Sequence, residues 1–146
     1  MNAIADSAKL GKNVSVWNFT YIGKDTEIGD NTKIGSLVHI DYGVKIGKNC
    51  LIEGGVYIPP LTVIEDGVFV GPCTVFTNDR NPPNPDRNAW RGVTVKEGVT
   101  IGANCTILAG VTIGKNARIG QHSNVLRDVP EGEVWFGNPA AKRKSR

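Results

Sequence analysis

An apolar residue recurs at every sixth position through most of the chain, and this period constrains the fold more than any other feature. The series begins at Ile4, continues without a break to Phe76, and resumes from Val95 to Val125. All nineteen positions hold Ile, Leu, Val or Phe. Up to Val70, the residue four positions after each of them is Ala, Val, Thr or Cys. A repeat this strict predicts one repetitive architecture.

A period of six differs from the 3.6 residues of an α-helix and contains the two-residue alternation of a strand. Short strands joined by tight corners would form a prism with three flat faces. Three hexads would make one coil of about 18 residues, and successive coils would stack as parallel strands about 4.8 Å apart. The large residue of each hexad would fill the interior and the small one would fit the crowded corner.

This pattern resembles the hexapeptide-repeat family over approximately residues 4–130. The resemblance implies an all-β fold, the left-handed parallel β-helix, and a homotrimer whose active sites lie between neighbouring prisms. We expect residues 1–130 to form the β-helix, with an extruded loop at 78–92. Residues 131–146 should form a capping segment and basic tail, with a helical turn or two near 139–144.

Composition limits the remaining classes. The 146 residues suit one domain, and a net charge of +3 is too small to indicate a nucleic-acid partner. No apolar stretch approaches the length of a membrane span, and the N-terminus lacks the regions of a signal peptide, so we expect a cytoplasmic protein without a membrane partner. Cys50 and Cys105 occupy the small inward position and are expected in the core, whereas Cys73 lies nearer a corner.

The repeat is lost between Phe76 and Val95. Residues 78–92 contain three prolines and no apolar residue at the sixth position, so they cannot continue a coil. A long insertion of this kind in a compact solenoid is usually functional or disordered. Arg80, Arg87 and Arg91, with Trp90, suit the binding of an anion and a ring, and Arg80, Trp90 and Arg91 are the predicted substrate-binding residues.

The segment 75–82 reads VFTNDRNP and resembles the FTND-x-x-P segment of acetyltransferases that act on nucleotide-linked 3-amino sugars. The runs 65–72 and 95–107 carry further matches. Pro83 stands where the family usually has Arg. The resemblance implies transfer of acetyl from acetyl-CoA to the amine of a nucleotide-linked amino sugar.

By the same resemblance, Asn78 would hold the amine or the tetrahedral oxyanion, and Asp79 would take a proton or orient the ammonium. Sugar O-acetyltransferases of this fold commonly carry His directly before the loop proline, where this chain has Asn81. A hydroxyl needs a base near neutral pH, whereas an amine need only lose a proton before it attacks. The sequence therefore favours N-acyl transfer. Alternatively, Asn78 caps the turn and Asp79 pairs with Arg80.

His39 is the third candidate catalytic residue. Steps of 18 place it in a column with Tyr21, Tyr57 and Val75, expected to point outward at one corner about two coils from Asn78. It would act beside the sugar or as a base, or belong to an aromatic ladder against a neighbouring subunit. His122 is expected at the surface. Two histidines cannot supply the three zinc ligands of the carbonic anhydrases with this repeat, so no metal is expected.

The predicted donor site uses two groups of residues. The coils after the loop offer small residues and one cation that could bind acetyl-CoA: Ala103, Ala109, Gly110 and Lys115. The ending at 137–142 reads GNPAAK and resembles the GNPAK ending of the family's acetyl-CoA enzymes. The resemblance assigns binding of acetyl-CoA to Asn138, Pro139, Ala140, Lys142 and Arg143. Lys144 and Arg146 add positive charge, and the segment would alternatively only cap the last coil.

These observations predict an acetyl-CoA-dependent N-acetyltransferase for a nucleotide-linked amino sugar in surface polysaccharide synthesis. The alternatives are an O-acetyltransferase for a sugar or other small acceptor, and a non-catalytic β-helix that serves in assembly.

Overall fold

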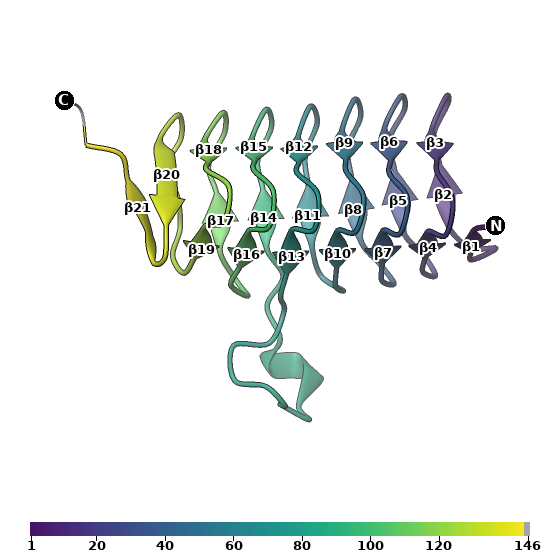
Figure 1. The fold of residues 1–146 in the computed structure, drawn as a ribbon. Helices are drawn as coiled ribbons and strands as arrows, with labels where there is room; N and C mark the ends of the chain where they lie inside the picture. Colours follow the sequence, from purple (N-terminus) through teal and green to yellow (C-terminus); the bar gives the residue numbers. More distant parts are fainter. Residues whose placement is uncertain (145–146) are drawn as a thin grey trace.

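The computed structural model describes residues 1–144, which form a prism of stacked coils with a loop projecting from its middle (Figure 1). Most strands are two residues long, and three strands complete one coil. We name the three faces sheets A, B and C in the order in which the chain visits them.

Each face is a parallel sheet, apart from the last strand pair of sheet C. Sheet A contains β1 (Ala3–Ile4), β4 (Tyr21–Ile22), β7 (His39–Ile40), β10 (Tyr57–Ile58), β13 (Val75–Phe76), β16 (Thr106–Ile107) and β19 (Asn124–Val125). Sheet B contains β2 (Lys9–Leu10), β5 (Glu27–Ile28), β8 (Lys45–Ile46), β11 (Val63–Ile64), β14 (Thr94–Val95) and β17 (Thr112–Ile113). Sheet C contains β3 (Ser15–Val16), β6 (Lys33–Ile34), β9 (Leu51–Ile52), β12 (Phe69–Val70), β15 (Thr100–Ile101), β18 (Arg118–Ile119), β20 (Val134–Gly137) and β21 (Ala140–Lys142).

The second residue of each two-residue strand points into the prism. Ile22 pairs with Ile40 and Ile40 with Ile58, so identical side chains stack along the axis. From Ile22 to Val125, every residue of the six-residue series is buried, and so are Cys50 and Cys105. The predicted fold of parallel coils around a continuous apolar core is confirmed, as is the core position of the two cysteines.

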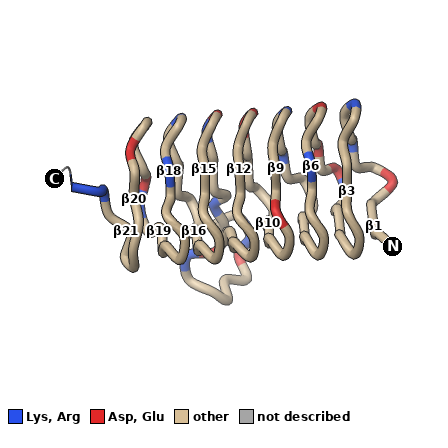
Figure 2. The backbone as a smooth tube through the Cα atoms, turned by 45° about the horizontal axis from the view of Figure 1, so that its top comes forward, with Lys and Arg blue, Asp and Glu red and all other residues tan. Residues whose placement is uncertain are grey.

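The corners use left-handed backbone, which Gly and Asn adopt most readily. Asn31, Asn49 and Asn116 have φ between 55° and 60° at the corner between sheets B and C, and Gly67 has φ 67° there. Acidic and basic residues share the tips of this corner along the stack (Figure 2). Asp30 accepts a hydrogen bond from the backbone N–H of Lys12, and Asp66 accepts one from that of Lys48, so these carboxylates also join successive coils.

The two ends of the prism differ. At the C-terminal end, β20 pairs with β18, and β21 returns antiparallel to β20. Trp135 is buried against the last coil, and the Arg127 guanidinium lies 5.0 Å from its ring centroid. The helical turn expected near 139–144 is wrong, because this segment forms a strand through main-chain pairing. At the N-terminal end, the inward residues Ile4 and Leu10 are each 39% exposed.

The loop leaves the prism after β13 and returns before β14, at the turn from sheet A to sheet B. It contains a short 3₁₀ helix, η1 (Arg87–Ala89), which the sequence did not indicate. The neck is closed by a hydrogen bond from the Arg91 N–H to the Asn78 carbonyl, at 2.9 Å. A Cβ on Gly92 would overlap the carbonyl oxygen of Leu61, so only glycine fits at this exit.

Candidate active site

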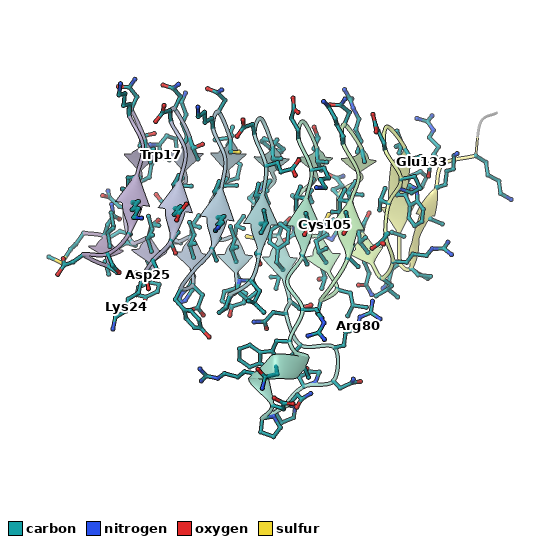
Figure 3. The ribbon with its side chains drawn as sticks, turned by 180° about the vertical axis from the view of Figure 1, so that it is seen from behind. Trp17, Lys24, Asp25, Arg80, Cys105 and Glu133 are labelled. Carbon is teal, nitrogen blue, oxygen red and sulfur yellow. The ribbon has the colours of Figure 1, made fainter. Side chains whose placement is uncertain are left out.

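The candidate site lies at the A–B corner, the edge of the prism where the chain passes from a sheet A strand to the following sheet B strand. Residues 59–62 form this corner below the loop and residues 108–111 form it above. Asn78 donates from Nδ2 to the carbonyl of Pro60, at 3.4 Å, and Arg80 donates from Nε to the carbonyl of Ala109, at 3.0 Å. Arg80 is at the base of the loop in Figure 3. The loop is thus fastened to the coils on both sides.

Asp79 holds the first turn of the loop. Its Oδ1 accepts the N–H of Asn81 at 3.0 Å, and its Oδ2 accepts the N–H of Asn84 at 2.8 Å. Pro82 and Pro83 lie between these two donors and have no N–H of their own. Neither contact is the pairing with Arg80 that the sequence offered as an alternative.

The remaining contacts bind the loop to itself. Trp90 donates from Nε1 to the carbonyl of Asn84, at 3.2 Å. Arg91 donates from Nη1 to the carbonyls of Asn88 and Trp90, both at 2.7 Å. Arg87, which the sequence grouped with Trp90, has its guanidinium carbon 5.5 Å from the centroid of that ring. Its exposed side chain adds a cation to the loop face beside that ring.

His39 lies on the flat face of sheet A rather than at a corner, because it belongs to strand β7. Its ring centroid is 4.7 Å from that of Tyr21 and 5.5 Å from that of Tyr57. Burial raises the pKa of Tyr57, and the nearby charge of Asp41 raises it further. Tyr57 pairs with Val75, whose strand leads into the loop, so His39 is two strands away from the loop base. The column therefore has the arrangement of an aromatic ladder.

Part of the predicted donor site shares the A–B corner. Gly110 is exposed there, whereas Ala109 is buried and presents its carbonyl to Arg80. One coil further, Leu126 and Arg127 follow β19 at the same corner, and with Pro139, Ala140 and Ala141 they line a hollow of about 310 Å³. Gly110, Arg127 and this hollow therefore follow one another along the A–B corner, from the loop toward the C-terminal hairpin.

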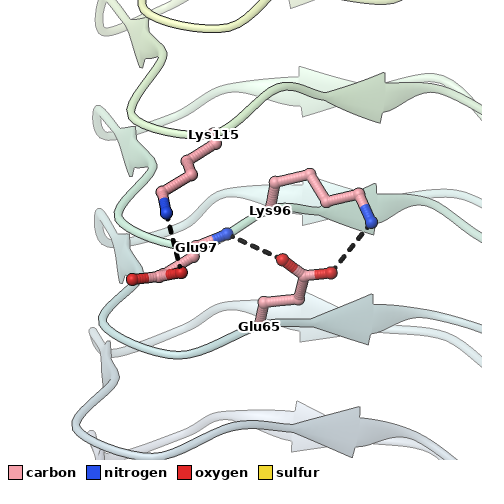
Figure 4. A network of polar contacts seen from close by, with 4 residues as sticks. All are labelled: Glu65, Lys96, Glu97 and Lys115. Carbon is pink, nitrogen blue, oxygen red and sulfur yellow. Dashed lines mark hydrogen bonds and ion pairs between the residues drawn. The ribbon is translucent and has the colours of Figure 1, made fainter.

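Other predicted donor residues lie elsewhere on the chain. Ala103 is at the corner between sheets C and A, and Lys115 is at the corner between sheets B and C. The Lys115 ammonium is 3.1 Å from a carboxylate oxygen of Glu97 (Figure 4). One prism does not bring these two residues together with Gly110.

The predicted donor residues of the C-terminal hairpin also lie in different places. Lys142 forms an ion pair with Glu133 at 2.7 Å, and this hydrogen bond is the main cause that lowers the pKa of Glu133. Lys142 and Arg143 border a larger hollow of about 610 Å³, on the side of the hairpin that includes Glu131 and Glu133. Asn138 accepts a hydrogen bond from Asn124. Arg146, part of the predicted basic tail, lies outside the described residues.

Within residues 1–144, no three His, Cys, Asp or Glu side chains gather in a group suited to hold a metal ion. The same residues include no helix of the length and apolar character needed to cross a membrane.

Comparison with family models identifies the repeat. The model described as bacterial transferase hexapeptide (six repeats) matches residues 7–42, 25–60, 43–78 and 92–127, with the loop between the last two matches. The chain belongs to the bacterial transferase hexapeptide family. Membership confirms the predicted fold, a left-handed parallel β-helix, and the predicted enzyme class, an acyltransferase. It also weighs against the alternative of a non-catalytic assembly protein. A search of curated proteins found no match to the chain.

Solved structures of hexapeptide acetyltransferases share the fold. One, from Vibrio cholerae O1 biovar eltor, is complexed with acetyl coenzyme A, is 30% identical, and aligns over 81% of this chain and 69% of its own with a TM-score of 0.70. PerB from Caulobacter crescentus, in complex with CoA and GDP-perosamine, is 24% identical over 98% of this chain, with a TM-score of 0.61. The acetyltransferase domain of PglB from Neisseria gonorrhoeae, in complex with acetyl coenzyme A, is 17% identical over 97%, with a TM-score of 0.56. The chain spans 54% of each of the last two.

The structure adds residues that the sequence did not single out. Arg127 lies where a ligand at the A–B corner could meet a cation, and Asn84 connects the two arms of the loop. Arg127 follows the last repeat position, Val125, at a corner, so the period alone could have placed it. No periodic signal reaches Asn84, because the repeat is absent from residues 78–92.

Proposed function

We propose that this transferase moves an acetyl group from acetyl-CoA to the amine of a nucleotide-linked amino sugar, at the A–B corner beside the loop. The observation that carries the proposal is the position of the VFTND segment. This segment stands where the loop interrupts the hexapeptide repeat of an acyltransferase. Its Asn78 contacts the carbonyl of Pro60 in the preceding coil, and the hollow bordered by Arg127 and Pro139 lies further along the same corner. PerB, which shares the fold, is described in complex with CoA and GDP-perosamine, and this supports a nucleotide-linked amino sugar as the acceptor here.

The chemistry needs positioning more than acid–base assistance. The amine nitrogen attacks the thioester carbonyl carbon, a C–N bond forms, the C–S bond breaks, and the proton lost by the amine balances the departing thiolate. Asn78 uses Nδ2 to contact Pro60, and among residues 1–144 no hydrogen bond reaches its Oδ1. That oxygen can accept a hydrogen bond from the amine, and the second N–H of Nδ2 can donate to the developing oxyanion.

The acceptor and donor would approach along the same corner. Arg87 and Trp90 would offer a cation and a ring to the nucleotide part of the acceptor. Arg80 and Arg91, in the same loop, each use one guanidinium nitrogen for their contacts within residues 1–144, which leaves further N–H groups for the acceptor. In this proposal acetyl-CoA lies along Gly110, Arg127, Pro139 and Ala140, with Asn138 beside Pro139 at the hairpin turn. Lys142 and Arg143 border the separate hollow on the Glu133 side of the hairpin. Ala103 and Lys115 could join this path only from a neighbouring prism.

A homotrimer is part of the proposal. The outer face of sheet A and its corners carry exposed apolar side chains, among them Phe19 at 68%, Leu37 at 66%, Leu61 at 52% and Tyr21 at 41%. Apolar patches of this kind mark protein interfaces. The outer face of sheet B instead carries Lys9, Glu27 and Lys45. Light scattering should give three times the 15.7 kDa chain mass. Within that assembly His39 would lie in the contact between prisms, near the acceptor.

We also propose a cytoplasmic location. The described chain holds its three cysteines as free thiols, as expected in a reducing compartment.

The decisive experiment measures thiol release from acetyl-CoA with a panel of UDP- and dTDP-linked amino sugars. Each amino sugar is paired with the corresponding hydroxyl sugar, which separates N- from O-acyl transfer. Release only with amines, together with an acetamido product seen by mass spectrometry, supports the proposal. Release with the hydroxyl sugars would instead support the O-acetyltransferase alternative. No release with any acceptor, and no heat of acetyl-CoA binding by calorimetry, would overturn it.

A further inference from the structure

The loop of residues 78–92 is one connected network of side-chain hydrogen bonds, and Asp79 is where that network joins the neck. The Asp79 carboxylate holds the N–H of Asn84 at 2.8 Å. Asn84 then accepts from two directions, with its carbonyl from Trp90 Nε1 and with its Oδ1 from the N–H of Asp86. Asp86 in turn accepts the N–H of Asn88 at 3.0 Å. Asn84, which Asp79 holds, therefore connects the Asp79 carboxylate to both Trp90 and Asp86.

The neck of the loop, next to Asp79, is formed by hydrogen bonds of Asn78. The Asn78 carbonyl accepts the N–H of Arg91, and its Nδ2 contacts Pro60. Arg80 fastens the other side of Asp79 to Ala109. Asp79 therefore lies between the residue proposed to meet the amine and the turn that carries the rest of the loop.

We propose that Asp79 is a positioning residue that fixes Asn78 and the acceptor-binding side of the loop, and that it does not carry the proton of the reaction. Both carboxylate oxygens are already engaged by backbone donors, and those donors flank a proline pair that offers none. A carboxylate is the side chain that can accept at two points at once, whereas a carboxamide can accept only at one. The expected effect on acceptor kinetics rests on the proposed function, whereas the role of Asp79 in ordering the loop does not.

The test compares Asp79→Asn with Asp86→Asn. In Asp79→Asn, the N–H of either Asn81 or Asn84 would face the NH₂ group of the new carboxamide, so one of the two hydrogen bonds to this side chain is lost. Asp86 uses only Oδ1, and a carboxamide oxygen can replace it, which makes Asp86→Asn a matched control in the same loop. Both variants are first checked for unchanged thermal melting and unchanged acetyl-CoA binding, which report on the prism rather than the loop.

Asp79→Asn should raise the KM of the acceptor by about tenfold to a hundredfold, the equivalent of one charge-assisted hydrogen bond. Its kcat should fall far less, and the limbs of its pH–rate profile should keep their positions. Trypsin should cut after Arg80, Arg87 or Arg91 at least about tenfold faster than in the wild type, because loss of such a bond increases local opening. Asp86→Asn should resemble the wild type in each measurement.

A proton-carrying Asp79 gives the opposite pattern. Its replacement would lower kcat by about a hundredfold or more, remove the limb that falls toward acid pH, and leave the acceptor KM and the trypsin rates unchanged. That result overturns the inference. If the wild type acetylates no amino sugar, the proposed function fails, and the trypsin rates of the two variants still decide whether Asp79 organises the loop.

Discussion

In the coils, most backbone N–H groups donate to backbone carbonyls of the next coil, whereas in the loop several of them donate to side chains. Tyr21 donates its N–H to the carbonyl of Val38, and Tyr57 repeats the contact two coils further along the stack with Thr74. In the loop, the N–H groups of Asn81, Asn84, Asp86 and Asn88 all go to Asp or Asn side chains. The coils depend on a repeated apolar interior, so their stability is shared. The loop depends on a few particular polar residues, so its shape can be lost while the prism remains.

The largest difference in the free energy of unfolding should appear between substitutions of the two residues of a single strand. Ile64 is 1% exposed inside the prism, and Val63 lies outside it in the same strand, β11. Ile64→Ala should lower the free energy of unfolding by about 2–5 kcal/mol, because a cavity remains among stacked isoleucines. Val63→Ala should cost less than about 1 kcal/mol. Denaturant unfolding at one fixed protein concentration measures both, and equal losses would show that the core is not what holds the coils.

Glycine offers the next contrast, since the loop and the coils require it for different reasons. Gly92→Ala places a Cβ against the Leu61 carbonyl, and it should cost about 1–3 kcal/mol and displace the loop exit. Gly67 has φ 67° and no atom within 4 Å of an added Cβ. Gly67→Asn should change stability by no more than about 0.5 kcal/mol, because the equivalent Asn49 already adopts this backbone. A larger loss for Gly67→Asn than for Gly92→Ala would contradict this distinction.

This difference also explains how much could be predicted from the sequence. The period predicted the sheets, the register and the buried cysteines, because an inward position every six residues is a property of every coil. It failed at the C-terminus, where the helical turn expected near 139–144 is strand β21, which depends on pairing with β20. It also put Tyr21 and His39 at a corner, although they lie on the flat face of sheet A.

The candidate site was predicted only in outline. The break in the repeat located the loop, and the VFTND motif singled out Asn78 and Asp79. The contacts of Asp79 with Asn81 and Asn84 follow from a chain reversal around Pro82 and Pro83, which no spacing rule gives. Ala103, Ala109 and Lys115 were grouped as small or basic residues of neighbouring coils. They lie at three different corners, because a shift of a few residues within an 18-residue coil changes the corner.

Asn78 should separate activity from stability. Asn78→Ala should lower turnover at least about tenfold, since it removes a hydrogen-bonding group assigned to the amine or oxyanion. The melting temperature should change little, because the contact of Nδ2 with Pro60 is long, at 3.4 Å. Asn88→Ala serves as the control, because Asn88 contributes its backbone N–H and carbonyl to the loop. Normal turnover in Asn78→Ala would reduce Asn78 to a turn residue.

The smallest effect should come from an ion pair on the coils. Glu65 accepts from Lys96 Nζ at 2.9 Å and from the N–H of Glu97 at 3.0 Å (Figure 4). The Lys96 hydrogen bond is the main cause that lowers the pKa of Glu65. Because both side chains are more than a third exposed, Glu65→Gln should cost less than about 1 kcal/mol at neutral pH.

The pH dependence of that cost follows from the direction of the shift. A lowered pKa in the folded state means that Glu65 stabilises the protein above its unfolded-state pKa, and that this contribution is lost as the pH falls through the folded-state value. The stability difference between wild type and Glu65→Gln should therefore shrink in acid, and it should also shrink with added salt. A difference that stays constant from neutral to acid pH would show that the Glu65 charge contributes nothing. The cost would then come from the hydrogen bond with the Glu97 N–H. This coil contact would then depend on a side chain that accepts a backbone N–H, as the contacts of the loop do.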